Sequence, residues 1–578
     1  MAGSSVVLLA LCLATACKPS PPAAAEQPAP PPTSPTVAPA PSGGHDGHGS
    51  PAASPARSAL LGNLGTHHRP ISAANPDAQR FFDEGLTLLY GFNHEEAFRS
   101  FERAATLDPR APMPHWGMSL ALGTNYNDTA TPDRLGQAYE HLAAARARAG
   151  NGSQVEKAFV DALALRYVET PDDGKQADRE QAYSKAMGQV SAKYADDLDA
   201  ATLYAESLMN LRPWKLYDVK GQPAPGTDVI VKTIESVLAR NPLHPGANHY
   251  YIHAVEASTA PERAMPSAKR LETLVPGAGH LVHMPAHIYI RTGDYLASAK
   301  SNAEAARVDE KYVQATGASG MYPLMYYGHN LQFESAALMF AGHYVGARAA
   351  AQKTVKLVEP IAGEVVMVQP FALQEGLVLV RFGRWDDALA LAAPPPGRPV
   401  QSVYHHFVRG AALAGKGDVA GASKEAEALA AAAKQVPADA AVSSANLAPP
   451  VVELARRDLA ARIADARGNS VAAVEAWTAA VAAEDTLGYA EPPDWLLPTR
   501  EGLGAALLRA SRPVEAEKVY RADLEVFRNN PRSLFGLWKS LDRQGKTAAA
   551  TTARTAFENA WRGADITLDD AALKVTAR

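Results

Sequence analysis

The chain has 578 residues, 47% of them hydrophobic and 20% charged, so it exceeds one ordinary domain unless it is built from repeats. Its formal net charge is -5 at pH 7, so the chain has no excess of the basic residues that bind nucleic acid, and we expect no nucleic-acid partner. The only two cysteines, Cys12 and Cys17, lie near the start. The folded body should therefore contain no disulfide and no thiolate ligand, so any metal there must be held by histidines and carboxylates.

Residues 1–17 form a short apolar run that ends in small residues, too short to span a bilayer, and they predict an export signal. The segment Ala14-Thr15-Ala16-Cys17 resembles the cleavage box of bacterial lipoproteins, although Ala14 replaces the usual leucine and no Lys or Arg precedes the run. This likeness implies lipidation at Cys17. The expected location is the periplasm, or the outer membrane and cell surface, with an N-terminal lipid anchor holding the exported protein to the membrane.

Residues 18–75 are rich in Pro, Ala and Ser and offer little to bury, which predicts a disordered tether between the anchor and the body. His45 and His48, in the segment GGHDGHG, have two interpretations. They could bind a metal ion, or they could be ordinary polar residues of a soluble linker.

The body reads as helical, because apolar residues recur at spacings of three and four and alanine is abundant. The segment FFDEGLTLLYGFNHEEAFRSFERAATLDP resembles a tetratricopeptide repeat (TPR). Two antiparallel helices approach closely where small residues face the partner, while a bulky residue fills the space beside them. The residues at the marker positions of this repeat are Gly85, Ala97, Phe101, Ala104 and Pro109.

A glycine turn followed by a small residue five places on recurs along the body, at intervals typical of helical repeats. The copies are Gly293-Tyr295-Ser298, Gly342-Tyr344-Ala347, Gly383-Trp385-Ala388, Gly417-Val419-Ala422 and Gly468-Ser470-Ala473, with weaker ones at Ala516, Tyr520 and Gly545. We predict an all-α, TPR-like solenoid of helical hairpins with a concave groove. Its expected parts are N-terminal repeats over 76–244, central repeats over 245–360 and C-terminal repeats over 361–578.

Residues 125–245 fit the repeat pattern less well, but helices are still predicted there. They lie around 135–149, 154–167, 179–193 and 199–210. The segment RPWKLYDVKGQPAPGTD, residues 212–228, then interrupts the pattern as a loop.

Three histidines within eight residues mark the segment GHLVHMPAHIYIRTGDY, which begins at Gly279. On a helix, His280, His283 and His287 project within about 60° of one another, on one face. Pro285 lies among them and should kink this helix.

The neighbouring repeats add to this histidine face. The preceding helix begins near Pro245 and carries His249, His253 and Glu256, again within about 60° of one another. The following repeat begins near Gly328 and presents His329 in its first turn. The resemblance to TPR arrays implies that positions 2, 5, 9 and 12 of the first helix line the concave surface, where these seven side chains fall.

Six imidazoles packed together would repel one another if protonated, so we interpret the cluster as a transition-metal site. Imidazole suits several metals, and the exported location without thiolates favours copper or zinc. The alternative is a hydrogen-bonded network with Tyr250, Tyr251 and Tyr289 as partners. Glu256 could be a ligand, a carboxylate that orients an imidazole, or the catalytic base of a metal-dependent hydrolase. The Tyr-Tyr-Ile between His249 and His253 lacks the glutamate of zincin helices.

The chain also resembles a bacterial group of exported TPR proteins, mostly without assigned activity. The motifs that carry the likeness are YGFNHEEAFRSF, HWGMSLALGTNYN, LMNLRPWKLYD, NHYYIHAVEAS, GHLVHMPAHIYIRTGDY, YYGHN and EPPDWLLPTRE. This resemblance implies that several aromatic, polar and proline residues form one functional surface with the histidines. The alternative is that they serve packing, as aromatics at helix starts and prolines in connectors usually do. With Tyr250, Tyr289 and Asn330, the expected groove residues are Trp116, Asn125, Asn127, Pro213, Trp214, Pro492, Pro493, Trp495 and Arg500. The resemblance to this bacterial group also implies a further histidine three residues after His329, and this chain has Gln332 at that position.

Two functions follow from these patterns. The first is a lipid-anchored binding scaffold whose groove holds a transition metal, and a protein or peptide partner, at the cell envelope. The second is a metal-dependent hydrolase or oxidase, in which Glu256 or a groove tyrosine moves protons and the loop at 212–228 acts as a lid. Four or more protein ligands to one ion would favour the first, and three ligands would favour the second.

Overall fold

The structure is a computed structural model that describes residues 59–171, 174–320 and 322–568. The predicted export signal, Cys17, His45 and His48 lie outside the described residues. Within the described ranges the chain forms helices, two isolated bridges at Tyr217–Pro223 and Ala441–Leu447, and no strand. The all-α prediction is thus confirmed. None of the helices in these ranges is both long and apolar enough to cross a membrane.

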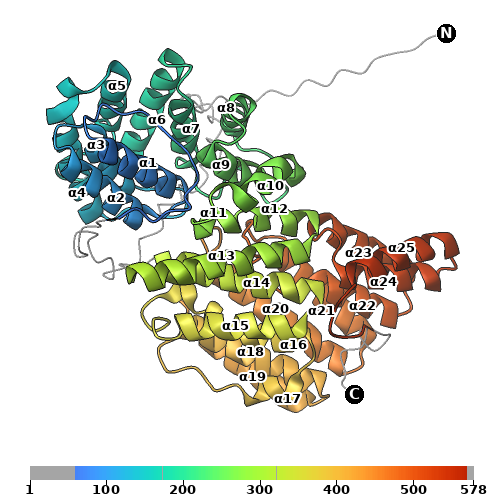
Figure 1. Cartoon of the computed structure of the whole chain (residues 1–578). Helices are drawn as coiled ribbons and strands as arrows, with labels where there is room; N and C mark the ends of the chain where they lie inside the picture. The colour runs from blue at the N-terminus through green and yellow to red at the C-terminus, as the bar shows by residue number, and fades with distance from the viewer. Residues whose placement is uncertain (1–58, 172–173, 321, 569–578) are drawn as a thin grey trace, which may run out of the picture. The chain divides into compact units, whose positions relative to one another are not determined.

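The N-terminal helices pack in chain order, each against the next (Figure 1). They are α1 (Pro76–Tyr90), α2 (His94–Leu107), α3 (Met113–Leu122), α4 (Pro132–Arg148), α5 (Gln154–Leu163), α6 (Gln176–Lys193), α7 (Leu198–Met209) and α8 (Thr227–Arg240), with the short η2 (Ala149–Asn151) after α4. The helices predicted for this less regular region are therefore present, and the loop predicted at 212–228 separates α7 from α8. Local caps set the helix starts, as where Ser153 and Glu156 form a capping box at α5.

The central helices carry the histidines. They are α9 (Pro245–Val255), η3 (Pro261–Ala264), α10 (Met265–Leu274), α11 (Gly279–His283), α12 (Pro285–Thr292), α13 (Tyr295–Thr316), η4 (Tyr322–Tyr327), α14 (Gly328–Ala341) and α15 (Tyr344–Val358). The predicted helix from Gly279 is divided into α11 and α12 at Met284, because Pro285 has no N–H to continue the hydrogen-bond ladder.

The C-terminal helices continue the array. They are η5 (Val366–Val368), η6 (Phe371–Leu373), α16 (Gln374–Arg381), α17 (Trp385–Ala390), α18 (Pro399–Gly415), α19 (Val419–Ala433), α20 (Ala448–Ala466), α21 (Ser470–Glu484), α22 (Thr499–Arg509), α23 (Pro513–Val526), α24 (Pro531–Arg543) and α25 (Thr547–Ala560). The predicted turn glycines adopt the left-handed backbone, with φ of 81° at Gly293 and 80° at Gly342. At Gly293 a Cβ would also lie 2.2 Å from the carbonyl oxygen of Arg528.

Small residues set the close approach of the hairpins, as the repeat pattern predicts. The ring of Phe101 on α2 lies between Gly85 of α1 and Gly117 of α3, and a Cβ at either glycine would meet that ring at 2.7 Å. Tyr520 on α23 lies in the same way between Gly504 and Gly536. Each bulky ring fits because both neighbouring helices have a small residue at the contact, which lets the helices approach closely. The stacked helical hairpins form a TPR-like solenoid.

Residues 59–75, the last part of the predicted tether, pack against the helices. Leu64 is buried, and the N–H of Leu61 donates to Glu84 over 2.7 Å. Arg69 forms an ion pair with Asp197 over 2.6 Å, and the two groups belong to segments more than a hundred residues apart. The tether boundary predicted at residue 75 is therefore wrong for this stretch, because its few apolar and charged side chains find specific partners on α1 and at the start of α7.

The C-terminal repeats return to the central ones. The hydroxyl of Tyr295 at the start of α13 donates to the carbonyl of Arg528 over 2.9 Å. The side chain of Arg528, in the turn between α23 and α24, forms an ion pair with Glu262 over 2.8 Å. Arg528, which follows α21 in the sequence, therefore contacts segments that lie next to the histidine-bearing helices in the sequence.

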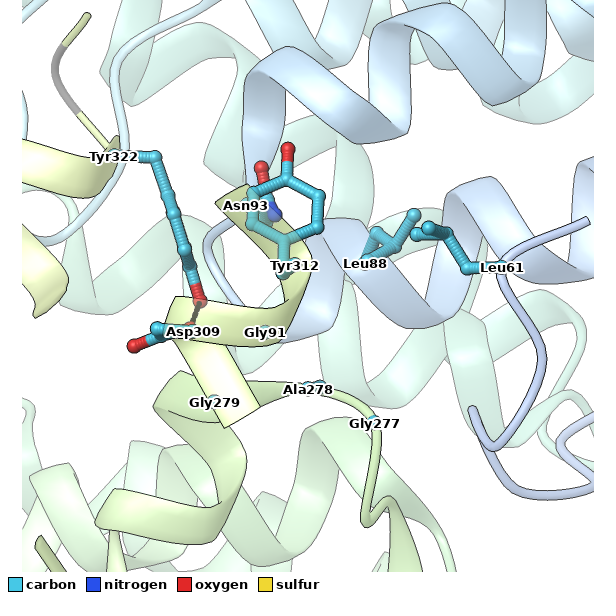
Figure 2. A pocket seen from close by; sticks show the side chains of 10 residues that line it. All are labelled: Leu61, Leu88, Gly91, Asn93, Gly277, Ala278, Gly279, Asp309, Tyr312 and Tyr322. Atoms are coloured by element: carbon cyan, nitrogen blue, oxygen red, sulfur yellow. Dashed lines mark hydrogen bonds between the residues drawn. The ribbon is translucent and has the colours of Figure 1, made fainter. Parts of the chain in front are cut away.

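A small pocket opens between the ends of α1, α11 and α13 (Figure 2). The hydroxyl of Tyr322 points at Asp309 and donates to its Oδ1 over 3.0 Å. Gly279 completes the pocket wall, since a Cβ there would lie 1.9 Å from the Asp309 carboxylate. No histidine lines this pocket, so it adjoins the cluster without being part of it.

Candidate metal centre

The seven predicted ligand residues come together, and they do so in the interior of the protein. α9 ends in Glu256 as its C-cap and supplies His249 and His253, whereas α11, α12 and α14 supply the other four histidines. The side chain of His329 is half-buried, and the other six residues are at most 2% exposed. The expected meeting of three successive repeats is thus observed, but the residues form a buried centre instead of the wall of an open groove.

The imidazole nitrogens gather in two sets, within each of which the nitrogens lie within 4.8 Å of one another. The first histidine triad consists of His249, His253 and His280. The second histidine triad consists of His283, His287 and His329.

In the first triad, the proton positions follow from the partners of each ring. His249 Nδ1 lies 2.6 Å from the carbonyl of Tyr90, and His253 Nδ1 lies 2.7 Å from Glu256 Oε1. Because these oxygens only accept, both Nδ1 atoms carry the proton and both Nε2 atoms carry a lone pair. His249 Nε2 lies 3.1 Å from His280 Nε2, while His253 Nε2 and His280 Nδ1 have no hydrogen-bond partner among the described residues.

The second triad repeats this arrangement. His283 Nδ1 donates to Asn302 Oδ1 over 2.6 Å, and Asn302 Nδ2 donates to the carbonyl of Ser298, which fixes the amide orientation. His287 Nδ1 donates to Glu256 Oε2 over 2.5 Å. Two Nε2 lone pairs therefore face each other across 2.7 Å, a contact that needs a proton or a metal cation between them.

Glu256 lies between the triads and joins them. One carboxylate oxygen accepts from His253 of the first triad, and the other accepts from His287 of the second. Burial alone would raise the pKa of this carboxyl, but His287 and His253 hold that pKa well below its usual range. Of the three roles open to Glu256 from sequence, the geometry favours a carboxylate that orients imidazoles, because both of its oxygens are engaged.

Burial keeps most of the rings neutral, which is the form that binds metal ions. Burial, together with neighbouring histidines, lowers the pKa of His249, His280 and His283 well below the ordinary value. Burial likewise lowers the pKa of His329, to about 3. At His287 burial also acts to lower the pKa, but Glu256 outweighs it and the pKa is raised.

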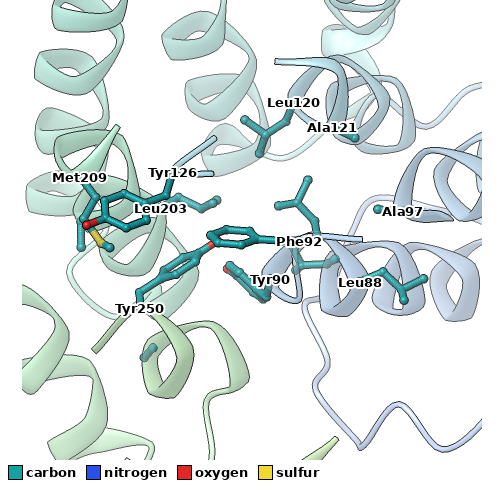
Figure 3. Close-up of a cluster of buried hydrophobic side chains, with 14 of the residues drawn as sticks. Leu88, Tyr90, Phe92, Ala97, Leu120, Ala121, Tyr126, Leu203, Met209 and Tyr250 are labelled. Atoms are coloured by element: carbon teal, nitrogen blue, oxygen red, sulfur yellow. The ribbon is translucent and has the colours of Figure 1, made fainter. Parts of the chain in front are cut away.

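Phenylalanine rings cover each triad. Phe92, in the turn between α1 and α2, lies against all three rings of the first triad, with its centroid 4.5 Å from that of His249. Figure 3 shows this ring between Tyr90, Tyr250 and Tyr126. Phe92 has a φ of 56°, a left-handed conformation that costs on the order of 1–3 kcal/mol for a non-glycine residue. Phe333 contacts the second triad in the same manner, 5.4 Å from His283.

A segment of the C-terminal half reaches the centre from the other side. The hydroxyl of Tyr489 lies 3.5 Å from Glu256 Oε2 and 2.5 Å from Glu491 Oε1. Burial raises the pKa of Glu491 to about 7, although His287 and Arg291 oppose the shift. Glu491 Oε2 has no hydrogen-bond partner among the described residues. An acidic group that can hold or release a proton near neutral pH is thus connected to the histidines through a tyrosine.

Some of the predicted groove residues contact the centre. Tyr250 lies 5.2 Å from His249, ring to ring, and Trp214 lies 5.8 Å from His253. Trp214 also donates to Asn127 Oδ1 over 3.1 Å. Like Phe92, Trp214 has a left-handed backbone, with a φ of 59°. The loop at 212–228 therefore contributes an aromatic wall to the first triad.

Other predicted groove residues serve elsewhere. Trp116 packs on Phe159, and Trp495 packs among core residues and donates to Asp458, so packing explains both tryptophans. Four others have polar partners: Asn125 contacts His94, Asn330 donates to Asp309, Tyr289 donates to Glu272, and Arg500 forms an ion pair with Asp485. The hydroxyl of Tyr251 donates to Glu235, so neither Tyr251 nor Tyr289 donates its hydroxyl proton to the histidines, whereas Tyr250 contacts His249 through its ring.

Sequence reasoning missed Phe92, Asn302, Phe333, Tyr489 and Glu491. Phe92 lies within the motif YGFNHEEAFRSF, and Glu491 begins EPPDWLLPTRE, so both motifs had drawn attention. Neither residue follows the helical spacing of the histidines, because each comes from a turn or a connector. Asn302 lies on α13, the second helix of its repeat, for which the pattern gives no register. Phe333 lies on α14, four residues after His329, where an apolar residue at helical spacing indicates ordinary packing.

A further histidine group, His67 with His244 around Asp199, is a satisfied network. His244 Nδ1 accepts from the N–H of Ala247, so its Nε2 carries the proton and donates to Asp199 over 3.2 Å. Asp199 Oδ1 also accepts from the hydroxyl of Tyr90 over 2.7 Å and lies 3.0 Å from His67 Nε2. This group therefore offers a metal ion no lone pair comparable to those of the two triads.

Comparison with protein-family models gives no match, and comparison with curated proteins also gives none. Among solved structures, the chain is similar to the TPR domain of P58(IPK), with 11% identity and a TM-score of 0.24 over 82% of this chain and 99% of that one. It is also similar to yeast Tom70, with 11% identity and a TM-score of 0.31 over 82% and 96% of the two chains. A structure of Naa15/Naa10 bound to HypK-THB gives 12% identity and a TM-score of 0.22 over 85% and 90%. These low values add nothing to the assignment made from the helices themselves.

Proposed function

We propose that this protein is a helical-repeat scaffold whose buried histidine cluster binds a transition metal, copper or zinc. The observation that carries the proposal is the pair of Nε2 lone pairs, on His283 and His287, held 2.7 Å apart because both Nδ1 atoms donate to fixed oxygens. Two nitrogens bound to one tetrahedral ion at about 2.0–2.1 Å lie roughly 3.3 Å apart, so the two rings need to separate by roughly 0.6 Å to bind the same ion. Coordination removes the repulsion without requiring a buried positive imidazolium.

The donor set supports the choice of metal. The described residues of the cluster offer six imidazoles and one carboxylate, and the two cysteines of the chain lie near its start. Imidazole suits zinc and copper, and the carboxylate holds ring orientation, as in other histidine-rich metal sites.

The surroundings of the site favour a scaffold at the cell envelope. Stacked helical hairpins present extended surfaces that repeat proteins use for protein or peptide partners. The start of the chain carries the export pattern and the lipoprotein-like box at Cys17, so we place this scaffold on a lipid anchor in the periplasm or at the outer membrane.

Metal content tests the proposal directly. The full chain, prepared without a polyhistidine tag, should retain zinc or copper after desalting, as measured by elemental analysis. His253→Ala and His283→Ala should each lower the metal content, because each removes a nitrogen donor. His141→Ala is the matched control, since His141 packs on Phe98 away from the cluster. Equal metal content in all four proteins would contradict the proposal.

A metal-dependent enzyme is the second candidate, favoured by three histidines in each triad and by the Tyr489–Glu491 pair. Three nitrogen donors leave a coordination position for a substrate or water, and a bound metal would supply Lewis-acid or redox chemistry. Glu491 is the better group to accept or donate a proton, because both oxygens of Glu256 are occupied by histidines. Ester hydrolysis and dioxygen consumption by the metal-loaded chain test this candidate. Glu491→Gln should abolish turnover and retain the metal, whereas unchanged turnover would exclude this role.

A further inference from the structure

The two triads are separate groups of donors that lie side by side. The ring centroids of His253 and His287, one from each triad, are 5.5 Å apart, and those of His280 and His283 are also 5.5 Å apart. Within each triad the nitrogens converge to within 4.8 Å. Among the described residues, the one such group that combines histidines of both triads does so through Glu256.

Glu256 makes the Nε2 atoms of the two triads point apart. It binds the Nδ1 atoms of His253 and His287, which belong to different triads. In an imidazole ring, Nδ1 and Nε2 lie on different edges, so an Nδ1 fixed on the carboxylate directs Nε2 away from it. His287 Nε2 is directed to His283, while His253 Nε2 belongs to the group with His249 and His280. A single ion placed in the second triad would leave His253 Nε2 of the first triad without a partner.

We propose that the cluster is a two-ion centre, with one transition-metal ion in each histidine triad and Glu256 as the carboxylate that positions both. This inference rests on the proposed metal-binding function and adds its stoichiometry and architecture. Each triad supplies three nitrogen donors. The Nε2 pair at 3.1 Å in the first triad is near the roughly 3.3 Å that one tetrahedral ion imposes on two ligands, and the pair at 2.7 Å in the second triad is shorter and would open when an ion binds. The negative carboxylate offsets part of the repulsion between two cations in a buried site.

A single shared proton explains the contacts less well. A proton between His283 and His287 would resolve the repulsion in the second triad. It would leave His253 Nε2, which is buried in the first triad and points toward His249 and His280, without a partner. A buried lone pair without a partner is costly, and a cation bound by His253 Nε2 with its two neighbouring imidazoles would remove that cost.

The covering rings support two equivalent sites. Phe92 covers the first triad and Phe333 covers the second, each in contact with all three histidines of its own triad. An apolar ring over each set limits the access of water and lowers the local dielectric constant, which strengthens metal–ligand bonds. The structure thus provides three donors and an apolar cover twice, and the two sets share the Glu256 carboxylate.

The stoichiometry of zinc binding tests the two-ion centre. The full chain, stripped with a chelator and reloaded with excess Zn²⁺, should retain two zinc ions per chain after desalting. His280→Ala should retain one, held by the second triad, and His329→Ala should retain one, held by the first. The double variant should retain none.

Other outcomes separate this inference from the proposed function. One zinc ion per wild-type chain, lost in both single variants, would overturn the two-ion centre and leave metal binding intact. No zinc in the wild type would overturn both. If a variant fails to fold, titration of the wild-type chain with Co²⁺, followed by visible absorption, decides the number alone. Saturation at two equivalents supports the proposal, and saturation at one contradicts it.

Discussion

A single carboxylate, that of Glu256, determines how four ring nitrogens are disposed. It fixes the protons of His253 and His287 on Nδ1, which frees the Nε2 atom of each ring for its own triad. A carboxylate can do this because it accepts at both oxygens, whereas an amide offers one acceptor and one donor. The role of this residue is therefore to position ligands that belong to two different repeats.

Glu256→Gln should weaken metal binding at both triads. The amide can accept from only one of the two Nδ1–H groups, and its NH₂ opposes the other, so one ring must change tautomer or turn. Loss of such an orienting partner typically lowers metal affinity by about 10–100-fold. Competition with a chelator of known affinity measures the effect. Glu272→Gln, at a glutamate bound to Tyr289 outside the cluster, is the control, and an equal affinity loss in both variants would contradict the assignment.

At the scale of the helices, two neighbouring helices pack closely where a glycine on one helix faces a large aromatic ring on the other. Gly85 on α1 and Gly117 on α3 admit Phe101 from both sides. This packing sets how α1, α2 and α3 stack, and with them the turn that carries Phe92 onto the first triad. Close packing tolerates little added volume, so these contacts position the site from a distance.

Gly85→Ala should destabilise the protein by about 1–3 kcal/mol, although alanine is the better helix former, because its Cβ would lie 2.7 Å from the Phe101 ring. Gly136→Ala is the matched control, since a Cβ at Gly136 on α4 meets nothing within 4 Å and should stabilise the helix by roughly 0.5–1 kcal/mol. Urea unfolding followed by circular dichroism compares the two. Shifts of the same sign would show that Phe101 does not limit the space at Gly85.

At the scale of the whole molecule, several buried carboxyl groups titrate near neutral pH. Burial raises the pKa of Glu206 and Asp309 to about 7, and that of Asp494 to about 6. These groups lie on different helices and in a connector, from the N-terminal repeats to the C-terminal ones. Each is stabilising when protonated and becomes a buried charge as the pH rises, so the whole array should be less stable in mildly alkaline solution.

Glu206→Gln should reduce this pH dependence. The folded pKa of about 7 lies above the ordinary 4.5, so the contribution of Glu206 is fully present below about pH 4.5 and is lost as the pH rises through 7. Between pH 5 and pH 8 the wild type should lose about 1–3 kcal/mol more unfolding free energy than the variant. Urea unfolding across this range measures the difference, and the exposed Glu475→Gln provides the control. Parallel pH profiles for wild type and Glu206→Gln would contradict the assignment.

Much of the fold could be predicted from periodicity, because helices and their turns are local. The starts of α9, α11 and α14 were predicted near Pro245, Gly279 and Gly328, and they begin at those residues. That the histidines lie close together could be predicted from their spacing of three and four residues, which places them on one face of each helix. Burial of the cluster could not be predicted in this way, because it depends on Phe92 from the first hairpin and on Tyr489 from beyond α21.

By itself, the sequence determined the all-helical hairpins and the convergence of histidines from three successive repeats, since both depend on spacings within a few turns of helix. Only the tertiary structure decided that these histidines divide into two triads, that Glu256 stands between them, and that aromatic rings close each one. The physical reason is that hydrogen-bond partners such as the Tyr90 carbonyl and Asn302 come from other helices, and their positions depend on how the whole array packs.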